Sequence, residues 1–259
     1  MKVQAILVAG GHGTRLLPFT RFTHKTLLPL HRRPVIDYAL GTIRRAGVTD
    51  ITIIGNQFIG QIAQHVGTGL AGENIHYVIE EEPAGVAAAL NLARPHATDC
   101  RLLVYFSDNI TTYELRADVE AFSASLNPPG CMLLAREVED PSAFGVAVLD
   151  EEGRLSDIIE KPASPPSNLA IGGIYLFDER FWNLLDEQTA IHGEAFSISD
   201  VNRRYLSEGV ATVRTLNEAT WIDCGTADSL LIASDMASRG EISPEPCIIR
   251  PGDPAPKGP

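Results

Sequence analysis

The chain has 259 residues, and its 33 Asp and Glu outnumber its 21 Lys and Arg, which gives a formal net charge of −12 at pH 7. An acidic chain lacks the cationic surface that binds phosphate groups, so we expect no nucleic acid and no membrane among its partners. A composition of 44% hydrophobic and 21% charged residues is typical of a globular protein, and no apolar run approaches the roughly 20 residues of a spanning helix.

The cysteines indicate the compartment. Cys100, Cys131, Cys224 and Cys247 are widely spaced and form no Cys-x-x-Cys pair. Such spacing favours reduced thiols over a disulfide framework or a zinc site. The apolar stretch at residues 5–9 is too short for the hydrophobic part of a secretory signal. We therefore expect a cytoplasmic protein.

Short β-branched runs alternate with helical patterns over the first half of the chain. This pattern predicts strands at Val3–Ala9, Ile51–Ile54, Ile75–Ile79 and Leu102–Phe106, with helices at Val35–Ala46, Gln57–Val66 and Gly85–Ala93. Such alternation is typical of parallel βαβ units and predicts an α/β fold, a doubly wound, mostly parallel, Rossmann-like mixed sheet with helices on both faces. Ligands bind beyond the carboxyl ends of such strands, which are followed here by Gly10–Arg15, Glu80–Gly85 and Ser107–Asn109.

The second half has a mixed pattern. It predicts strands at Cys131–Ala135, Val146–Leu149, Leu155–Glu160, Ile171–Phe177, Thr212–Thr215 and Thr220–Ile222, and helices at Glu179–Leu185, Ser197–Leu206 and Ala227–Ala237. From Glu241 onward, six of the last 19 residues are proline. We expect one domain over residues 1–240 and an extended or disordered Pro-rich tail over residues 241–259.

A glycine-rich turn, Gly10-Gly11-His12-Gly13-Thr14-Arg15-Leu16, follows the first predicted strand. Missing Cβ atoms let the backbone approach a ligand and leave N–H groups free to point at an anion. Arg15 adds a planar charge suited to phosphate oxygens. Leu16 excludes the dinucleotide fingerprint, and a Gly-Lys-Ser/Thr sequence, which the P-loop needs, is missing. A tight turn without a ligand is the simpler alternative.

Three further charged residues are candidates for the same site. Lys25 lies in the same long loop as Arg15, where it is either a second cation for a polyphosphate or a solvated surface charge. Asp108 and Asp223 each follow an apolar strand. Each fits a turn cap or a Mg²⁺ ligand, and the repetition of the context favours the metal.

Taken in order, these motifs resemble the sugar-1-phosphate nucleotidylyltransferases, and most closely the glucose-1-phosphate thymidylyltransferase branch. The resemblance extends to about Arg239. Its motifs are Gly10–Leu16, Lys25 with Leu27-Leu28-Pro29, Pro83-Ala84-Gly85, Ser107–Ile110, Phe144–Val146, Glu160-Lys161-Pro162, Gly173–Tyr175 and Trp221–Thr226. Each motif is common alone, but the ordered set is specific.

The resemblance implies that a nucleoside triphosphate and a sugar 1-phosphate react with Mg²⁺ to give a nucleotide sugar and pyrophosphate. It implies a nucleotide-binding half over residues 1–115 and a sugar-phosphate half over residues 116–240. The nucleotide would contact Ala9, Gly10, Gly11, Gly13, Thr14, Glu80, Pro83 and Gly85, with Arg15 and Lys25 on its phosphates. Asp108 and Asp223 would hold Mg²⁺. The sugar phosphate would contact Asn109, Gly145, Glu160, Lys161 and Gly173, and the catalytic set would be Arg15, Lys25, Asp108, Lys161 and Asp223.

Glu80 departs from the thymidylyltransferase branch, which has Gln at this position to recognise the pyrimidine. A carboxylate only accepts hydrogen bonds, whereas thymine and uracil present one N–H between two carbonyl groups. Guanine presents two neighbouring donors, N1–H and N2–H₂, and an acidic segment before Pro-x-Gly also resembles the guanylyltransferases. GTP therefore competes with dTTP as the expected nucleotide. The alternative is that Glu80 points into solvent with Glu81 and Glu82 and that a backbone group recognises the base.

Two other departures affect the substrate and the assembly. Thr26 stands where the thymidylyltransferase branch usually has a Gln that touches the sugar, which leaves the sugar open. Longer relatives continue with helices that support tetramers, whereas this chain continues with its Pro-rich tail, so a dimer and a tetramer both stay open. A catalytically inactive, nucleotide-sugar-binding regulatory homologue is the alternative function, although all five catalytic candidates are present.

Overall fold

The computed structural model describes residues 1–82, 84–193 and 196–249. Its strands are β1 (Val3–Ala9), β2 (Pro29–Leu30), β3 (Arg33–Pro34), β4 (Asp50–Gly55), β5 (Asn74–Ile79), β6 (Arg101–Phe106), β7 (Asn109–Thr111), β8 (Cys131–Glu137), β9 (Gly145–Leu149), β10 (Leu155–Glu160), β11 (Leu169–Phe177), β12 (Ala211–Thr215) and β13 (Trp221–Asp223). Its α-helices are α1 (Val35–Arg45), α2 (Ile59–Val66), α3 (Val86–Ala93), α4 (Arg116–Ala124), α5 (Phe181–His192), α6 (Ile198–Ser207) and α7 (Ala227–Arg239).

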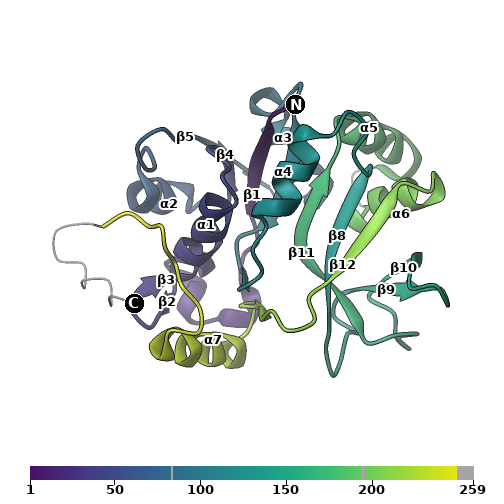
Figure 1. Cartoon of the computed structure of the whole chain (residues 1–259). Helices are drawn as coiled ribbons and strands as arrows, with labels where there is room; N and C mark the ends of the chain where they lie inside the picture. Colours follow the sequence, from purple (N-terminus) through teal and green to yellow (C-terminus); the bar gives the residue numbers. More distant parts are fainter. Residues whose placement is uncertain (83, 194–195, 250–259) are drawn as a thin grey trace.

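One mixed sheet runs through both halves of the chain, in the order β10-β9-β11-β6-β1-β4-β5 (Figure 1). The neighbours β6, β1, β4 and β5 are parallel. The long strand β11 pairs antiparallel with β6 and also with β8 and β9, which joins the second half to the first. The predicted α/β fold with a mixed, mostly parallel sheet is confirmed.

The residues of β1 alternate between two apolar cores, one on each face of the sheet. Ile6 packs in one core with Leu90 of α3, whereas Leu7 packs in the other with Leu40 of α1 and Phe122 of α4. The period of two along a strand places successive side chains on opposite faces. A near-continuous apolar strand is therefore buried on both faces, and helices cover both, as predicted.

The structure differs from the predicted elements where the sequence signal is weak. Helix α4 was not predicted, because its nine residues bury only Asp118, Val119 and Phe122 and so show little apolar periodicity. Helix α5 begins two residues later than predicted and continues to His192. Strands β2, β3 and β7 have two or three residues each, which is too short for an alternating pattern.

Over the residues that the structure describes, no helix has the length and apolar character needed to cross a membrane. The four cysteines are buried as free thiols. Within the same residues, His, Cys, Asp and Glu side chains form no group of three or more that could hold a metal ion.

The C-terminal tail packs on the domain. Residues 241–249 run in an extended path beside α1 (Figure 1, yellow), and Arg45 of that helix donates a hydrogen bond of 2.5 Å to a tail carbonyl. Two tail side chains, Ile242 and Cys247, are buried. The alternative of a disordered tail is therefore wrong for 241–249, and 250–259 lie outside the described residues.

Gly41 in the middle of α1 allows the tail to approach. A Cβ at this position would lie 2.3 Å from the carbonyl oxygen of Pro244, which is closer than atoms can pack. We expect Gly41→Ala to lower the unfolding free energy by about 1–2 kcal/mol, although Ala favours a free helix. Urea unfolding measures this difference.

Gly60 of α2 provides the matched control, since a Cβ there would meet no atom within 4 Å. Gly60→Ala should leave stability unchanged or raise it by up to about 1 kcal/mol. Equal stabilisation by both substitutions would show that the tail does not pack against Gly41 in solution.

Candidate active site

A cavity of about 680 Å³ opens beyond the carboxyl ends of β1 and β6, between these strands and the second half of the chain. The sequence had predicted ten of its lining residues: Gly11, Arg15, Lys25, Asp108, Asn109, Gly145, Glu160, Lys161, Gly173 and Asp223. Six other predicted residues are outside the cavity lining: Ala9, Gly10, Gly13, Thr14, Glu80 and Gly85. Pro83 lies outside the described residues.

Lys25 and Asp108 form an ion pair at one end of the cavity. Lys25 begins a short 3-10 helix, Lys25–Leu27, and Asp108 lies between β6 and β7. Burial opposes ionisation of Asp108, but the Lys25 ammonium and the hydrogen bonds to the carboxylate together hold its pKa below the usual range. The glycine at position 11 leaves room for this pair, because a Cβ there would lie 3.2 Å from Lys25 Nζ.

Asp223 lies beside Asp108, because β13 pairs with β7 and aligns Asp223 with Asn109. Burial and the neighbouring Asp108 carboxylate raise the pKa of Asp223 to about 6. The Arg15 guanidinium lies over Gly225, where a Cβ would be 2.5 Å from its nitrogen and 2.6 Å from the Asp223 carboxylate. The fold thus gathers two carboxylates and two cations at this end.

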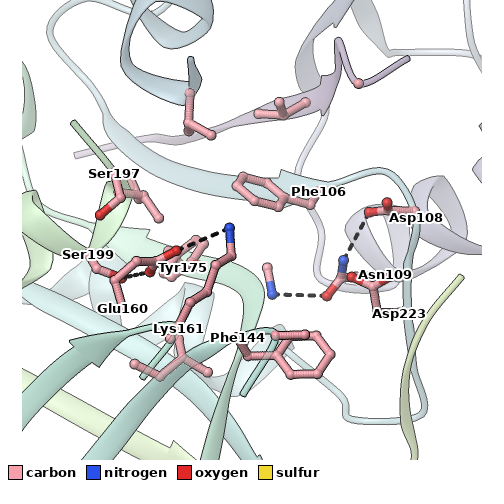
Figure 2. Close-up of a pocket in the computed structure, with 18 of the residues that line it drawn as sticks. Phe106, Asp108, Asn109, Phe144, Glu160, Lys161, Tyr175, Ser197, Ser199 and Asp223 are labelled. Atoms are coloured by element: carbon pink, nitrogen blue, oxygen red, sulfur yellow. Dashed lines mark hydrogen bonds and ion pairs between the residues drawn. The ribbon is translucent and has the colours of Figure 1, made fainter. Parts of the chain in front are cut away.

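Asn109 reaches the cavity wall, and both ends of its side-chain amide make hydrogen bonds within the protein (Figure 2). Its Nδ2 donates to Asp108 at 3.0 Å, while its Oδ1 accepts from the Gly173 backbone at 2.9 Å and from the Trp221 indole at 2.7 Å. These bonds fix the orientation of the Asp108 carboxyl. The contact of Asn109 with a sugar stays a prediction.

Glu160 and Lys161 lie at the other end of the cavity, at the end of β10 (Figure 2). Ser199 donates a 2.6 Å hydrogen bond to Glu160, and Lys161 Nζ lies 3.4 Å from the same carboxylate. Lys161 has a φ of 43°, an uncommon conformation for a residue with a side chain. The side chain of Lys161 is 65% exposed and so remains free to bind an anion.

The sequence missed the apolar part of this cavity. Its walls include Val86, Phe106, Phe144, Ile171, Tyr175, Ile198 and Trp221. Such side chains resemble ordinary core residues in the sequence, and only the fold shows that they line a cavity. Ser197 and Ser199 were also missed, although the N-terminus of a predicted helix at Ser197 is a signal that could have drawn attention to them.

Glu80 is 5% exposed, whereas its neighbours Glu81 and Glu82 are both exposed. Its carboxylate lies against the first glycine of the loop, since a Cβ on Gly10 would be 1.9 Å from Glu80 Oε2. Burial raises the pKa of this carboxyl. The side chain therefore faces the glycine-rich loop, and the alternative that it points into solvent is wrong.

Thr26 is buried, and its hydroxyl hydrogen-bonds to the ring of His24 at 2.7 Å. It does not line the cavity. The Thr26 hydroxyl therefore pairs with His24, and a contact of this side chain with a sugar stays a prediction.

Among the residues that the structure describes, the positive and negative charges that line the cavity are equal in number. Three cations, Arg15, Lys25 and Lys161, face three carboxylates, Asp108, Glu160 and Asp223. Two polyanionic ligands would leave an excess of negative charge here, which a divalent cation would offset.

The chain is similar to known proteins over most of its length. A family model described as nucleotidyl transferase matches residues 4–239. The low-salt glycan biosynthesis nucleotidyltransferase Agl11 of Haloferax volcanii is 31% identical over 236 residues, which are 90% of this chain and 66% of that protein. A glucose-1-phosphate thymidylyltransferase of Mycobacterium tuberculosis is 34% identical over 238 residues, 90% of this chain and 81% of that protein.

Two solved structures have the same fold. A Bacillus anthracis glucose-1-phosphate thymidylyltransferase candidate superposes with a TM-score of 0.85 at 34% identity, covering 91% of this chain and 95% of its own. A UDP-glucose pyrophosphorylase bound to UDP-glucose superposes with a TM-score of 0.80 at 21% identity, covering 93% of this chain and 100% of that chain. A likeness at this low identity shows only that the two chains share a fold. The chain therefore belongs to the nucleotidyl transferase family and is a nucleotidyltransferase of the sugar-1-phosphate nucleotidylyltransferase type.

Proposed function

We propose that this nucleotidyltransferase joins GTP and a sugar 1-phosphate into a nucleotide sugar with release of pyrophosphate, and that it needs Mg²⁺. The observation that carries the reaction is one cavity with Arg15, Lys25 and two carboxylates at one end and Lys161 at the other. These groups suit two phosphate-bearing substrates that must meet inside the cavity. The named relatives act in the same class of reaction.

The chemistry requires a sugar phosphate oxygen to attack the α-phosphorus of the nucleotide in line with the departing pyrophosphate. Arg15 and Lys25 bind and orient the triphosphate, and Lys161 binds the attacking phosphate. Their fixed positive charges stabilise the charge that develops on the phosphoryl oxygens. Glu160, held by Ser199, accepts hydrogen bonds from sugar hydroxyl groups. No nucleophilic side chain is required.

The carboxylates of Asp108 and Asp223 fit a magnesium ion. Mg²⁺ binds through one or two carboxylates and completes its coordination with substrate phosphates and water. Burial raises the pKa of Asp223, and so does the neighbouring Asp108 carboxylate, whose repulsion a bound cation would relieve. When bound, the ion would neutralise charge on the phosphates.

Glu80 supports guanine as the base. The buried carboxylate faces the glycine-rich loop at Gly10, and its two oxygens can accept both guanine donors, N1–H and N2–H₂. The carbonyl groups of thymine would instead face a carboxylate that offers no donor. GTP is therefore the proposed nucleotide, ahead of dTTP.

A crossed substrate panel tests the proposal. Five nucleoside triphosphates, GTP, dTTP, UTP, CTP and ATP, are each combined with a set of sugar 1-phosphates and Mg²⁺, and pyrophosphate release is followed. GTP should give the highest kcat/KM with at least one sugar. A clear preference for dTTP would overturn the base assignment, and no turnover with any pair would favour a regulatory homologue.

The same carboxyl predicts a pH dependence of nucleotide selection. Because burial raises the pKa of Glu80, its neutral form appears at a higher pH than for an exposed Glu. A neutral carboxyl presents a donor beside an acceptor, which suits guanine less and thymine more. The ratio of kcat/KM for GTP to that for dTTP should therefore fall as the pH decreases from about 8 to about 5. A constant ratio would contradict this role for Glu80.

A further inference from the structure

His24 is buried at the base of the loop that carries Lys25. The side chain is 1% exposed, and its Nε2 lies 2.5 Å from the backbone oxygen of Ala9, directly before the glycine-rich turn. Its Nδ1 lies 3.2 Å from the backbone nitrogen and 2.7 Å from the hydroxyl of Thr26. The imidazole therefore bridges the two loops that frame the triphosphate end of the cavity.

These partners determine the tautomer. A carbonyl oxygen only accepts, so Nε2 carries the proton and donates to Ala9. Nδ1 is then an acceptor whose lone pair faces both the N–H and the O–H of Thr26. His24 is thereby the N-cap of the 3-10 helix Lys25–Leu27. Burial lowers the pKa of His24 to about 4, which keeps the ring neutral near pH 7.

The neighbouring backbone is held as well. Gln61 of α2 accepts from the His24 backbone N–H at 3.1 Å and donates to the Phe22 carbonyl at 2.9 Å. Lys25 is thus the residue between two buried anchors, His24 and Thr26, while its own side chain extends to Asp108. The position of the Lys25 ammonium depends on where this loop is held relative to β1.

We propose that His24 is a positioning residue, which sets the distance between Lys25 and the glycine-rich loop by its hydrogen bond to Ala9. Two phosphate-binding elements must keep a fixed separation to engage one triphosphate, since displacement of about 1 Å is enough to impair a reaction. This inference rests on the proposed contact of Lys25 with the nucleotide phosphates. The additional point is that an uncharged, buried side chain sets the position of the Lys25 ammonium relative to the glycine-rich loop.

Two substitutions separate the bond to Ala9 from the helix cap. In His24→Asn the side-chain oxygen can still accept from Thr26, but the side chain is too short to reach Ala9. In His24→Gln the amide nitrogen extends about as far as Nε2 and can donate to Ala9, while the acceptor near Thr26 is lost. The measurements are kcat and KM for each substrate, with the melting temperature of each variant.

We expect His24→Asn to lower kcat/KM for the nucleotide roughly 10- to 100-fold, with KM for the sugar phosphate changed less than about 2-fold. His24→Gln should recover most of the lost activity. The matched control is Trp182→Phe, which removes a buried bond of 2.8 Å to the Ala97 carbonyl outside the cavity. It should lower the melting temperature without changing the nucleotide kinetics.

Four outcomes would overturn the proposal, and the last of them leaves the role of Lys25 intact. In the first, His24→Asn has wild-type kinetics and His24→Gln is impaired, which would assign the role to the cap. In the second, both variants lose only thermal stability, as Trp182→Phe does. In the third, Lys25→Met has wild-type nucleotide kinetics, which would overturn the proposed role of Lys25 itself. Impaired Lys25→Met with unimpaired His24→Asn would refute the role of His24 alone.

Discussion

Asp108→Asn should lower kcat roughly 10²- to 10³-fold while the protein stays folded. The carboxylate pairs with Lys25 on one oxygen and accepts from Asn109 at 3.0 Å on the other. An amide keeps the volume but has one acceptor, so it can satisfy only one of these two donors. It also removes one of the two charges proposed to hold Mg²⁺. Pyrophosphate release measured over a Mg²⁺ titration is the assay.

Asp186→Asn is the control for loss of a carboxylate. Asp186 is exposed and pairs with Arg94 at 2.7 Å, and neither residue lines the cavity. Such exposed pairs contribute little to stability, so this variant should resemble the wild type. If Asp108→Asn kept more than about a tenth of the turnover at saturating Mg²⁺, the metal and charge assignment would be wrong.

The sequence allowed the charged residues at one end of the cavity to be predicted as neighbours, because they follow local rules. Gly11 and Arg15 lie in the loop that follows β1, and Asp108 follows β6. Parallel strands such as these end at one edge of the sheet. Asp223 was predicted from a matching context, and pairing of β13 with β7 places it beside Asp108.

Other parts of the site depend on contacts between distant residues. The Trp221 indole donates to Asn109 across 112 positions, so the sequence could suggest a polar contact for Asn109 but not its partner. Phe106 packs where Gly173 has no Cβ, and a Cβ there would lie 2.7 Å from it. A single aromatic residue at the end of a strand gives no sign of this. His24 was overlooked because a histidine in a loop has no pattern around it.

Glu80→Gln should shift nucleotide preference from GTP toward dTTP and UTP. Glutamine has nearly the same size, so it fits against Gly10, but it presents one acceptor and one donor. The amide oxygen and NH₂ of this glutamine complement the N3–H and the neighbouring carbonyl of thymine or uracil. With guanine, by contrast, one of the two base donors would face the amide NH₂. Loss of a buried hydrogen bond and gain of a donor–donor contact should change the ratio of kcat/KM for GTP to dTTP by roughly 10²- to 10³-fold.

The adjacent acidic residues provide controls with the same change of charge. Glu81→Gln and Glu82→Gln alter exposed side chains, so each should leave the nucleotide ratio within about 3-fold of the wild type. Glu80→Gln should also remove the pH dependence of the ratio, because an amide does not titrate in this range. An unchanged ratio in Glu80→Gln, or an equal change in the two controls, would show that Glu80 does not contact the base. In that event the general negative charge of the segment, or the backbone of the loop, would have to select the nucleotide.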